Sequence, residues 1–152
     1  MTTDEQSAYE EFARRAGQGL VRAFVPVRGL DDAPDAAAEA LAYAWEHWER
    51  VGAMDNPMGY LYRVGQSRTR RRRPGLLPAP EAVGMPDVEP ALVPALRALP
   101  DTQRTAIWLV HACGWTYVET AEAMGVSPSA VGTHVKRAMD RLRAGLEVDS
   151  RA

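Results

Sequence analysis

The sequence has few of the residues and patterns that mark a secreted, membrane-bound or metal-binding protein. Cys113 is its only cysteine, so no disulfide can form within the chain, and with His111 alone beside it there is no ligand set for structural zinc. No apolar run approaches the roughly 20 residues that a membrane span needs, and residues 1–11 are acidic and polar, unlike a signal peptide. We therefore expect a cytoplasmic protein with no membrane association, in which Cys113 is a small buried hydrophobe.

The sequence also lacks the patterns on which enzymes depend. It has no glycine-rich phosphate loop, no cluster of metal ligands and no nucleophile at a recognisable spacing from a base. We expect no catalytic residue, no metal, no cofactor and no small-molecule substrate. A folded chain is nevertheless predicted, because 46% hydrophobic and 25% charged residues are ordinary values for a globular protein.

Charge is strongly segregated along the chain, although the net charge of −2 is small. Residues 1–60 carry eleven acidic residues against five arginines. Residues 63–73 reverse the sign, because they hold six arginines and no acid. An arginine-rich block either stays solvated or binds phosphate, and the surrounding sequence must be used to distinguish the two.

Apolar spacing predicts three helices in the N-terminal half. Residues 4–24 carry apolar side chains three and four positions apart, as an amphipathic helix does. Pro26 and Gly29 interrupt this pattern, and a second helix is expected over residues 34–50. A third helix begins at Asn56–Pro57 and runs into the arginine block.

Residues 74–94 contain six prolines, which remove backbone donors and fix φ. The proline-rich stretch is expected to be an extended tether without a strand or a long helix. It divides the chain into a helical domain over 1–73, a linker over 74–87 and a second helical domain over 88–148. The predicted fold class is therefore all-α, with two small helical domains joined by the linker.

The C-terminal half contains the pattern of a helix-turn-helix. Thr116 and Glu119 have the spacing of a capping box, which starts a short helix that Gly125 ends. Ser127 is a good N-cap and Pro128 suits the first position of a longer helix. That longer helix has an apolar stripe at steps of three and four: Val131, Val135, Ala138, Leu142 and Leu146. Two helices joined in this way have the spacing of a unit that reads DNA.

The exposed face of the longer helix carries the candidate DNA contacts. Short polar residues at its start can approach base edges, and basic residues farther along can reach phosphates. An ordinary solvated helix face is the alternative interpretation. The candidates are Ser127, Ser129, Ala130, Thr133, His134, Lys136, Arg137 and Arg141.

Two blocks of the sequence together resemble the extracytoplasmic function sigma factors. Region four of that family is matched by residues 99–104, 114–121 and 125–127. Region two is matched by residues 32–35, Glu39, Ala44–Trp45 and the run Asn56–Val64, NPMGYLYRV. Helix-turn-helix motifs alone are widespread, so the specificity comes from finding both blocks in this order across a proline-rich linker.

The resemblance implies a factor that binds core RNA polymerase and directs transcription initiation by recognising the minus-thirty-five and minus-ten elements of promoter DNA. The implied polymerase contacts are Asp32, Asp35 and Glu39, whose charge would complement a basic coiled coil. The implied minus-ten contacts are Tyr60, Tyr62, Arg63, Gln66, Ser67, Arg70 and Arg71. The two tyrosines are the expected platforms for unstacked bases. An anti-sigma factor is a further candidate partner.

Two alternative functions stay open at this point. A stand-alone helix-turn-helix regulator would use residues 116–143 to bind an operator as a dimer, without polymerase, and would have no need of the acidic and arginine-rich blocks before them. The other alternative is an interaction protein that resembles a sigma factor but does not bind promoters. Gly132 and the alanines at 36–38 favour it, because glycine weakens the recognition helix and small side chains weaken a polymerase contact.

Overall fold

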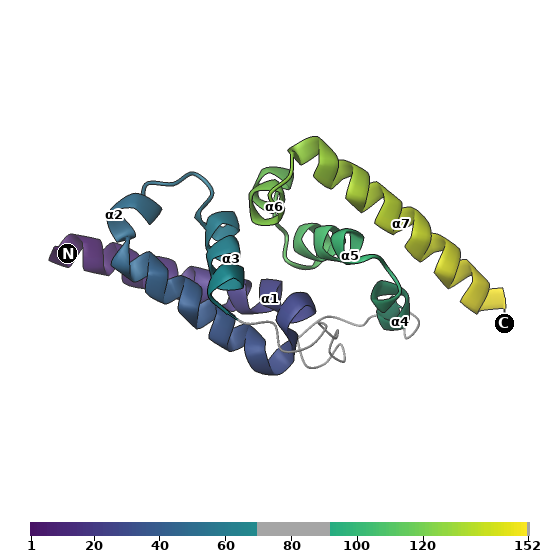
Figure 1. The fold of residues 1–152 in the computed structure, drawn as a ribbon, viewed down its shortest axis with the longest axis horizontal. Helices are drawn as coiled ribbons and strands as arrows, with labels where there is room; N and C mark the ends of the chain where they lie inside the picture. Colours follow the sequence, from purple (N-terminus) through teal and green to yellow (C-terminus); the bar gives the residue numbers. More distant parts are fainter. Residues whose placement is uncertain (70–91, 152) are drawn as a thin grey trace.

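The computed structural model describes residues 1–69 and 92–151, with side chains described through residue 147. Over these residues the chain is helical and contains no strand, which confirms the predicted all-α class (Figure 1). The N-terminal unit consists of α1 (Thr3–Glu46), α2 (Trp48–Val51) and α3 (Pro57–Arg68). The C-terminal unit consists of α4 (Leu92–Arg97), α5 (Asp101–Ile107), the π-helical turn η2 (Trp108–Ala112), α6 (Tyr117–Met124) and α7 (Pro128–Arg151). The predicted linker over 74–87 lies outside the described residues.

The helix α1 consists of two arms joined at a bend. Gly29 forms the bend with φ of 83° and ψ of 169°, a conformation that glycine adopts because it has no Cβ. The sequence predicted a wider interruption, but helix continues through both Pro26 and Pro34. Each proline lies near the end of an arm, so each removes only one hydrogen bond close to the bend. For Pro26 the missing N–H leaves the carbonyl of Arg22 without its intrahelical donor.

The two arms of α1 and the helix α3 enclose the core of the N-terminal unit. Its largest buried side chains are Leu20, Phe24, Leu61 and Tyr62. The second arm contributes mainly alanines, whose short side chains let the helices approach closely: Ala33, Ala36, Ala37, Ala40 and Ala44. Arg28 is also buried, and its guanidinium donates to the backbone oxygen of Gln66 at 2.9 Å and to Thr69 Oγ1 at 3.1 Å. These bonds tie the bend of α1 to the end of α3.

The helix-turn-helix forms as its sequence predicts. The Thr116 hydroxyl and the Glu119 carboxylate each accept a hydrogen bond of 3.0 Å from the other's backbone N–H, which is the predicted capping box. Gly125 ends α6 in the left-handed conformation with φ of 69°. Ser127 Oγ then accepts a hydrogen bond from the N–H of Ala130 and caps α7. Four of the five predicted stripe residues are buried: Val131, Val135, Ala138 and Leu142.

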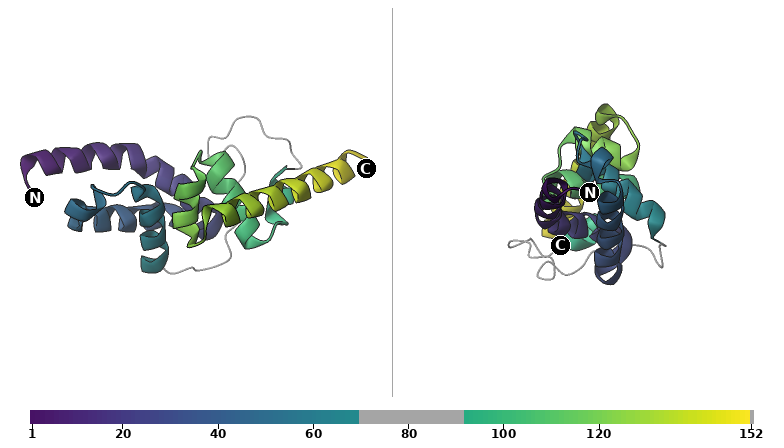
Figure 2. Two further views of the ribbon diagram at one scale, coloured as in Figure 1. Left: turned by 90° about the horizontal axis from the view of Figure 1, so that it is seen from above. Right: turned by 90° about the vertical axis from the view of Figure 1, so that its left-hand side faces the viewer.

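The two units pack against one another through a shared apolar cluster. Buried side chains of α1 and α3 are continuous with those of α4, α5, η2, α6 and α7. α6 lies beside α3, whereas the two termini lie at opposite ends of the molecule (Figures 1 and 2). The first half of the helix-turn-helix therefore covers part of the N-terminal unit.

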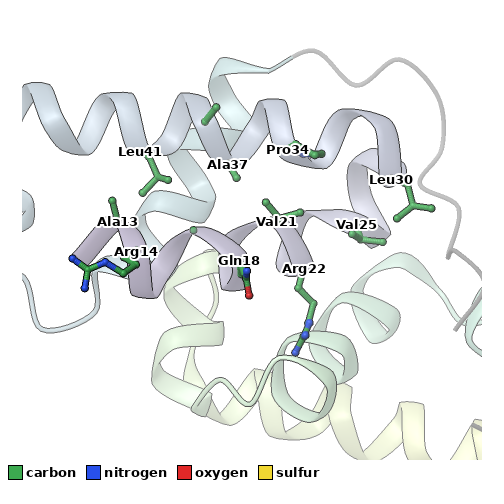
Figure 3. A pocket seen from close by; sticks show the side chains of 12 residues that line it. Ala13, Arg14, Gln18, Val21, Arg22, Val25, Leu30, Pro34, Ala37 and Leu41 are labelled. Carbon is green, nitrogen blue, oxygen red and sulfur yellow. The ribbon is translucent and has the colours of Figure 1, made fainter. Parts of the chain in front are cut away.

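An apolar groove of about 560 Å³ runs between the two arms of α1 (Figure 3). Its lining includes Ala13, Gly17, Val21, Val25, Ala37 and Leu41. Small side chains on both arms keep the groove open. None of the helices in the described part of the chain combines the length and the apolar character needed to cross a membrane.

Candidate nucleic-acid interface

The helix α7 presents a polar face on the side opposite its buried stripe. The predicted contacts Ser127, Ser129, Thr133, Lys136, Arg137 and Arg141 are all exposed there, whereas Ala130 and His134 are half-buried. The helix α7 continues beyond α6 toward the C-terminal end of the molecule (Figure 2). The structure therefore brings the predicted recognition residues onto one accessible helix face.

The hydroxyl groups at the start of α7 have different local partners. Ser127 Oγ is occupied by the cap to Ala130 and lies 3.1 Å from Ser129 Oγ. The Thr133 hydroxyl donates to the backbone oxygen of Ser129 at 3.2 Å, which leaves its lone pairs for another donor. Ser127 is thus a structural cap, and Ser129 and Thr133 are better placed to meet the edges of bases.

A second polar surface surrounds Tyr60 at the start of α3. The hydroxyls of Tyr60 and Tyr43 are 2.8 Å apart, and the Arg50 guanidinium donates to both. Arg68 lies over the ring of Tyr43, with its guanidinium carbon 4.9 Å from the ring centroid, and His47 stacks on the same ring. The hydrogen bond between the Tyr60 and Tyr43 hydroxyls is the main reason that the pKa of Tyr60 is raised, and burial adds to it. Aromatic rings held among arginines can bind single-stranded nucleic acid, which offers stacking faces and phosphates.

The structure does not support Tyr62 as a platform for unstacked bases. Tyr62 is only 1% exposed, stacks on Phe24 with ring centroids 4.8 Å apart, and makes a T-shaped contact with Trp115. The prediction failed because Tyr60 and Tyr62 are two positions apart, a spacing that puts them on different sides of a helix. Tyr60 is half-buried and keeps its place on the polar surface.

The remaining predicted contacts of the minus-ten region differ in exposure. Arg63 and Ser67 are exposed, and Gln66 is half-buried. Arg63 forms an ion pair of 3.4 Å with Glu122 of α6. Arg70 and Arg71 lie outside the described residues.

Comparison with known proteins assigns the family. Residues 91–142 match the family model for sigma-70, region 4. The whole chain aligns with 93% of the RNA polymerase sigma-E factor of Streptomyces antibioticus, with 31% identity over 170 aligned positions. The chain belongs to the extracytoplasmic function sigma factors. The predicted family is thereby confirmed.

Two solved structures share the fold of this sigma factor. One is the sigma factor RpoE of Bartonella quintana, solved with the anti-sigma factor NepR, with a TM-score of 0.71 and 24% identity over 93% of this chain and 98% of that one. The other is CnrH, solved with the cytosolic domain of CnrY, with a TM-score of 0.68 and 23% identity over 95% of this chain and 90% of that one. Both likenesses extend over the two helical units.

The acidic residues predicted to bind polymerase lie at and beyond the bend of α1 in this sigma factor. Asp35 and Glu39 are exposed and four positions apart, so they share one face of the second arm. Asp32 is half-buried, one turn closer to the bend. Between the two exposed acids, Ala38 lines the apolar groove, so an acidic edge borders an apolar surface.

Several residues of the candidate interface were not found by sequence reasoning. Tyr43 comes from α1, His47 from its junction with α2 and Arg50 from α2. The fold brings all three to Tyr60 and Arg68 of α3. The four-residue step from Tyr43 to His47 is the one local signal, because it places both rings on one helix face. No sequence spacing could reveal their contact with a different helix.

Proposed function

We propose that this sigma factor binds core RNA polymerase and directs transcription initiation by recognising minus-thirty-five and minus-ten promoter elements. The observation that carries the proposal is the exposed face of α7, which combines hydroxyls and basic side chains inside the segment that matches sigma-70, region 4. The match of this face to the family model is what distinguishes it from an ordinary solvated helix face.

Recognition of the minus-thirty-five element is assigned to α7. Ser129 and Thr133 lie on its first turns, where a helix in the major groove brings side chains to base edges. Lys136, Arg137 and Arg141 follow on the exposed face, where they can contact phosphates. In this assignment, the residues that contact bases and those that contact DNA phosphates occupy different parts of the helix.

Contact with the minus-ten element is assigned to α3 and to the residues gathered around Tyr60. Tyr60 offers a ring for stacking, and Arg50, Arg63 and Arg68 offer positive charge to the strand. Gln66 and Ser67 follow along the helix as polar candidates. Arg70 and Arg71 remain candidates from the sequence alone.

Polymerase binding is assigned to the second arm of α1. Asp35 and Glu39 supply negative charge that would orient the encounter with a basic partner surface. The adjoining groove between the arms supplies apolar area. Because transcription takes place in the cytoplasm, the proposal places the chain there.

An anti-sigma factor is the second protein partner that we propose. Its support comes from the two solved relatives. RpoE was solved with the anti-sigma factor NepR, and CnrH was solved with the cytosolic domain of CnrY. The stand-alone regulator is not favoured, because the likeness to sigma factors extends over the entire chain.

Transcription in vitro tests the proposal most directly. The purified chain is combined with core polymerase and a library of genomic templates, and the transcripts are mapped. We expect initiation at a small set of promoters that share two elements. Changing Ser129 and Thr133 together to alanine should alter the upstream element that is preferred, and changing Arg15, an exposed arginine of α1, to alanine should not. Failure to initiate from any template would refute the proposal.

A further inference from the structure

Gly132 is a glycine inside the recognition helix, in the second turn of α7. Glycine is unfavourable there, because it loses more backbone entropy on folding than alanine does and brings no side chain to pack. The backbone does not require it, since positive φ values occur at Gly29, Gly114 and Gly125 and not at Gly132. The reason for a glycine at this position therefore lies in its surroundings.

The ring of Tyr117 packs beside Gly132. Tyr117 is the first residue of α6, and a Cβ built at Gly132 would lie 3.4 Å from Tyr117 Cε2 and 3.9 Å from Tyr117 Cδ2. These distances leave room for a methyl group but for nothing larger between the ring and α7. The missing side chain at 132 thus lets an aromatic ring from α6 lie close against the backbone of α7.

The Tyr117 ring borders the exposed face of α7. Gly132 is three positions after Ser129 and four before Lys136, so the three residues follow one another along one side of the helix. Ser129 and Lys136 are exposed, and Gly132 is half-buried. Tyr117 is 43% exposed although it is a large aromatic residue. The ring therefore meets α7 on one side and stays open to solvent on the side of helix α7 that carries Ser129 and Lys136.

We propose that Tyr117 is a specificity-determining residue of the minus-thirty-five contact, and that its ring contacts the C5-methyl group of a thymine in the major groove. This inference rests on the proposed function, because it takes α7 to enter that groove. The thymine methyl is the apolar group that distinguishes base pairs in the major groove. Ser129 and Thr133 offer hydroxyls to base edges, whereas Tyr117 adds apolar surface at the level of the same first turns of α7.

The pairing of Tyr117 with Gly132 gives the glycine a role in DNA recognition. A longer side chain at 132 would occupy the space in which the ring lies. The glycine therefore replaces a side chain of α7 with one that α6 supplies. Both helices of the helix-turn-helix then contribute to the surface that meets the bases, and Gly132 no longer argues for a chain that has lost promoter binding.

The packing of the ring on Gly132 can be measured in the free chain, without polymerase or DNA. An aromatic ring displaces the magnetic resonance frequencies of hydrogens beside it. The Hα shifts of Gly132 should therefore differ from random-coil values in the wild type and in Tyr117→Phe, and should move toward those values in Tyr117→Ala. Val118→Ala is the matched control, because Val118 is an exposed apolar residue of α6 that faces a different side of the helix. Gly132 shifts that do not respond to loss of the ring would overturn the proposal.

Replacing thymine with deoxyuracil removes the methyl group alone and tests the contact with DNA. Promoter fragments that carry deoxyuracil in place of each thymine of the minus-thirty-five element are bound to the holoenzyme in filter assays. At one position we expect the replacement to weaken binding of the wild type and of Tyr117→Phe about threefold to fourfold, as loss of one buried methyl-sized group does. The same replacement should leave binding of Tyr117→Ala unchanged, and Val118→Ala should respond as the wild type does.

Two results of the binding assay would overturn the proposal. The first is equal binding of thymine and deoxyuracil fragments by the wild type at every position. The second is a loss of binding in Tyr117→Phe as large as in Tyr117→Ala, which would assign Tyr117 to a phosphate contact through its hydroxyl. Failure of the wild-type holoenzyme to bind any promoter would instead count against the proposed function, whereas the Gly132 shifts are measured independently of it.

Discussion

The rings of Phe24 and Tyr62 lie parallel, with centroids 4.8 Å apart and an interplanar angle of 8°. Phe24 comes from the first arm of α1 and Tyr62 from α3, and both are almost completely buried. Trp115 of the C-terminal unit also packs against Tyr62, with the two rings nearly perpendicular at 83° and their centroids 5.8 Å apart. A residue expected from sequence to touch DNA is therefore a central packing residue of the fold.

Replacing Tyr62 with alanine should destabilise the protein by about 3–5 kcal/mol, because the change empties a buried aromatic site. Tyr62→Phe should cost much less, since it keeps the stacked ring. Denaturant unfolding followed by circular dichroism measures both. Tyr60→Ala is the matched comparison, and its smaller cost should reflect its partial exposure. A loss below about 1 kcal/mol for Tyr62→Ala would contradict the packing role.

Reversing both charges at Asp35 and Glu39 should weaken binding to core polymerase. The expected cause is lost charge complementarity, so the association rate and its salt dependence should change most. Surface plasmon resonance with immobilised core polymerase measures both quantities. Glu10 and Glu11, exposed acids of the first arm, provide a control with the same change in net charge. If the Asp35/Glu39 variant binds core polymerase as well as the Glu10/Glu11 variant does, the acidic residues of the second arm have no special role in polymerase binding.

Stability should fall as the pH rises above 9, partly because of Cys113. Burial raises the pKa of this thiol from 9.0 to about 12, against a smaller opposing effect of Arg22. The folded chain keeps the proton where the unfolded chain loses it, so unfolding releases a proton and higher pH favours the unfolded state. We expect about 1 kcal/mol of this contribution to be lost between pH 9 and 10. The unfolding free energy of Cys113→Ala, measured over the same pH range, should lack that loss. If the curves of unfolding free energy against pH ran parallel in the variant and the wild type, Cys113 would not be the source of the loss.

The sequence predicted those features of the fold that depend on local chemistry. The capping box at Thr116, the left-handed Gly125 and the buried stripe of α7 each follow from residues a few positions apart, and all are present. Contacts between distant segments were not predictable in this way. The approach of α6 to Gly59 and the hydrogen bond from Trp108 to Arg22 join residues about 60 and 86 positions apart. The spacing of Tyr60 and Tyr62 shows that they point to different sides of α3, but the burial of Tyr62 against Phe24 and Trp115 depends on segments distant in sequence. The boundaries of the linker at 74 and 87 remain a prediction.

Removing the charge of Arg137 should weaken promoter binding about equally for all sequences. A phosphate contact releases counterions without reading bases, so the slope of log affinity against log salt should become shallower by about one unit. Filter binding over a salt series, with holoenzyme and several promoter fragments, measures both effects. Arg15→Ala removes the same charge from an exposed site on α1 and should leave the slope unchanged.

Ser129→Ala and Thr133→Ala should behave differently, because loss of a base contact costs affinity for some upstream elements and not for others, with little change in slope. If Arg137→Ala instead altered the ranking of promoters and left the slope intact, Arg137 would be a base contact and the division of labour along α7 would have to be reversed.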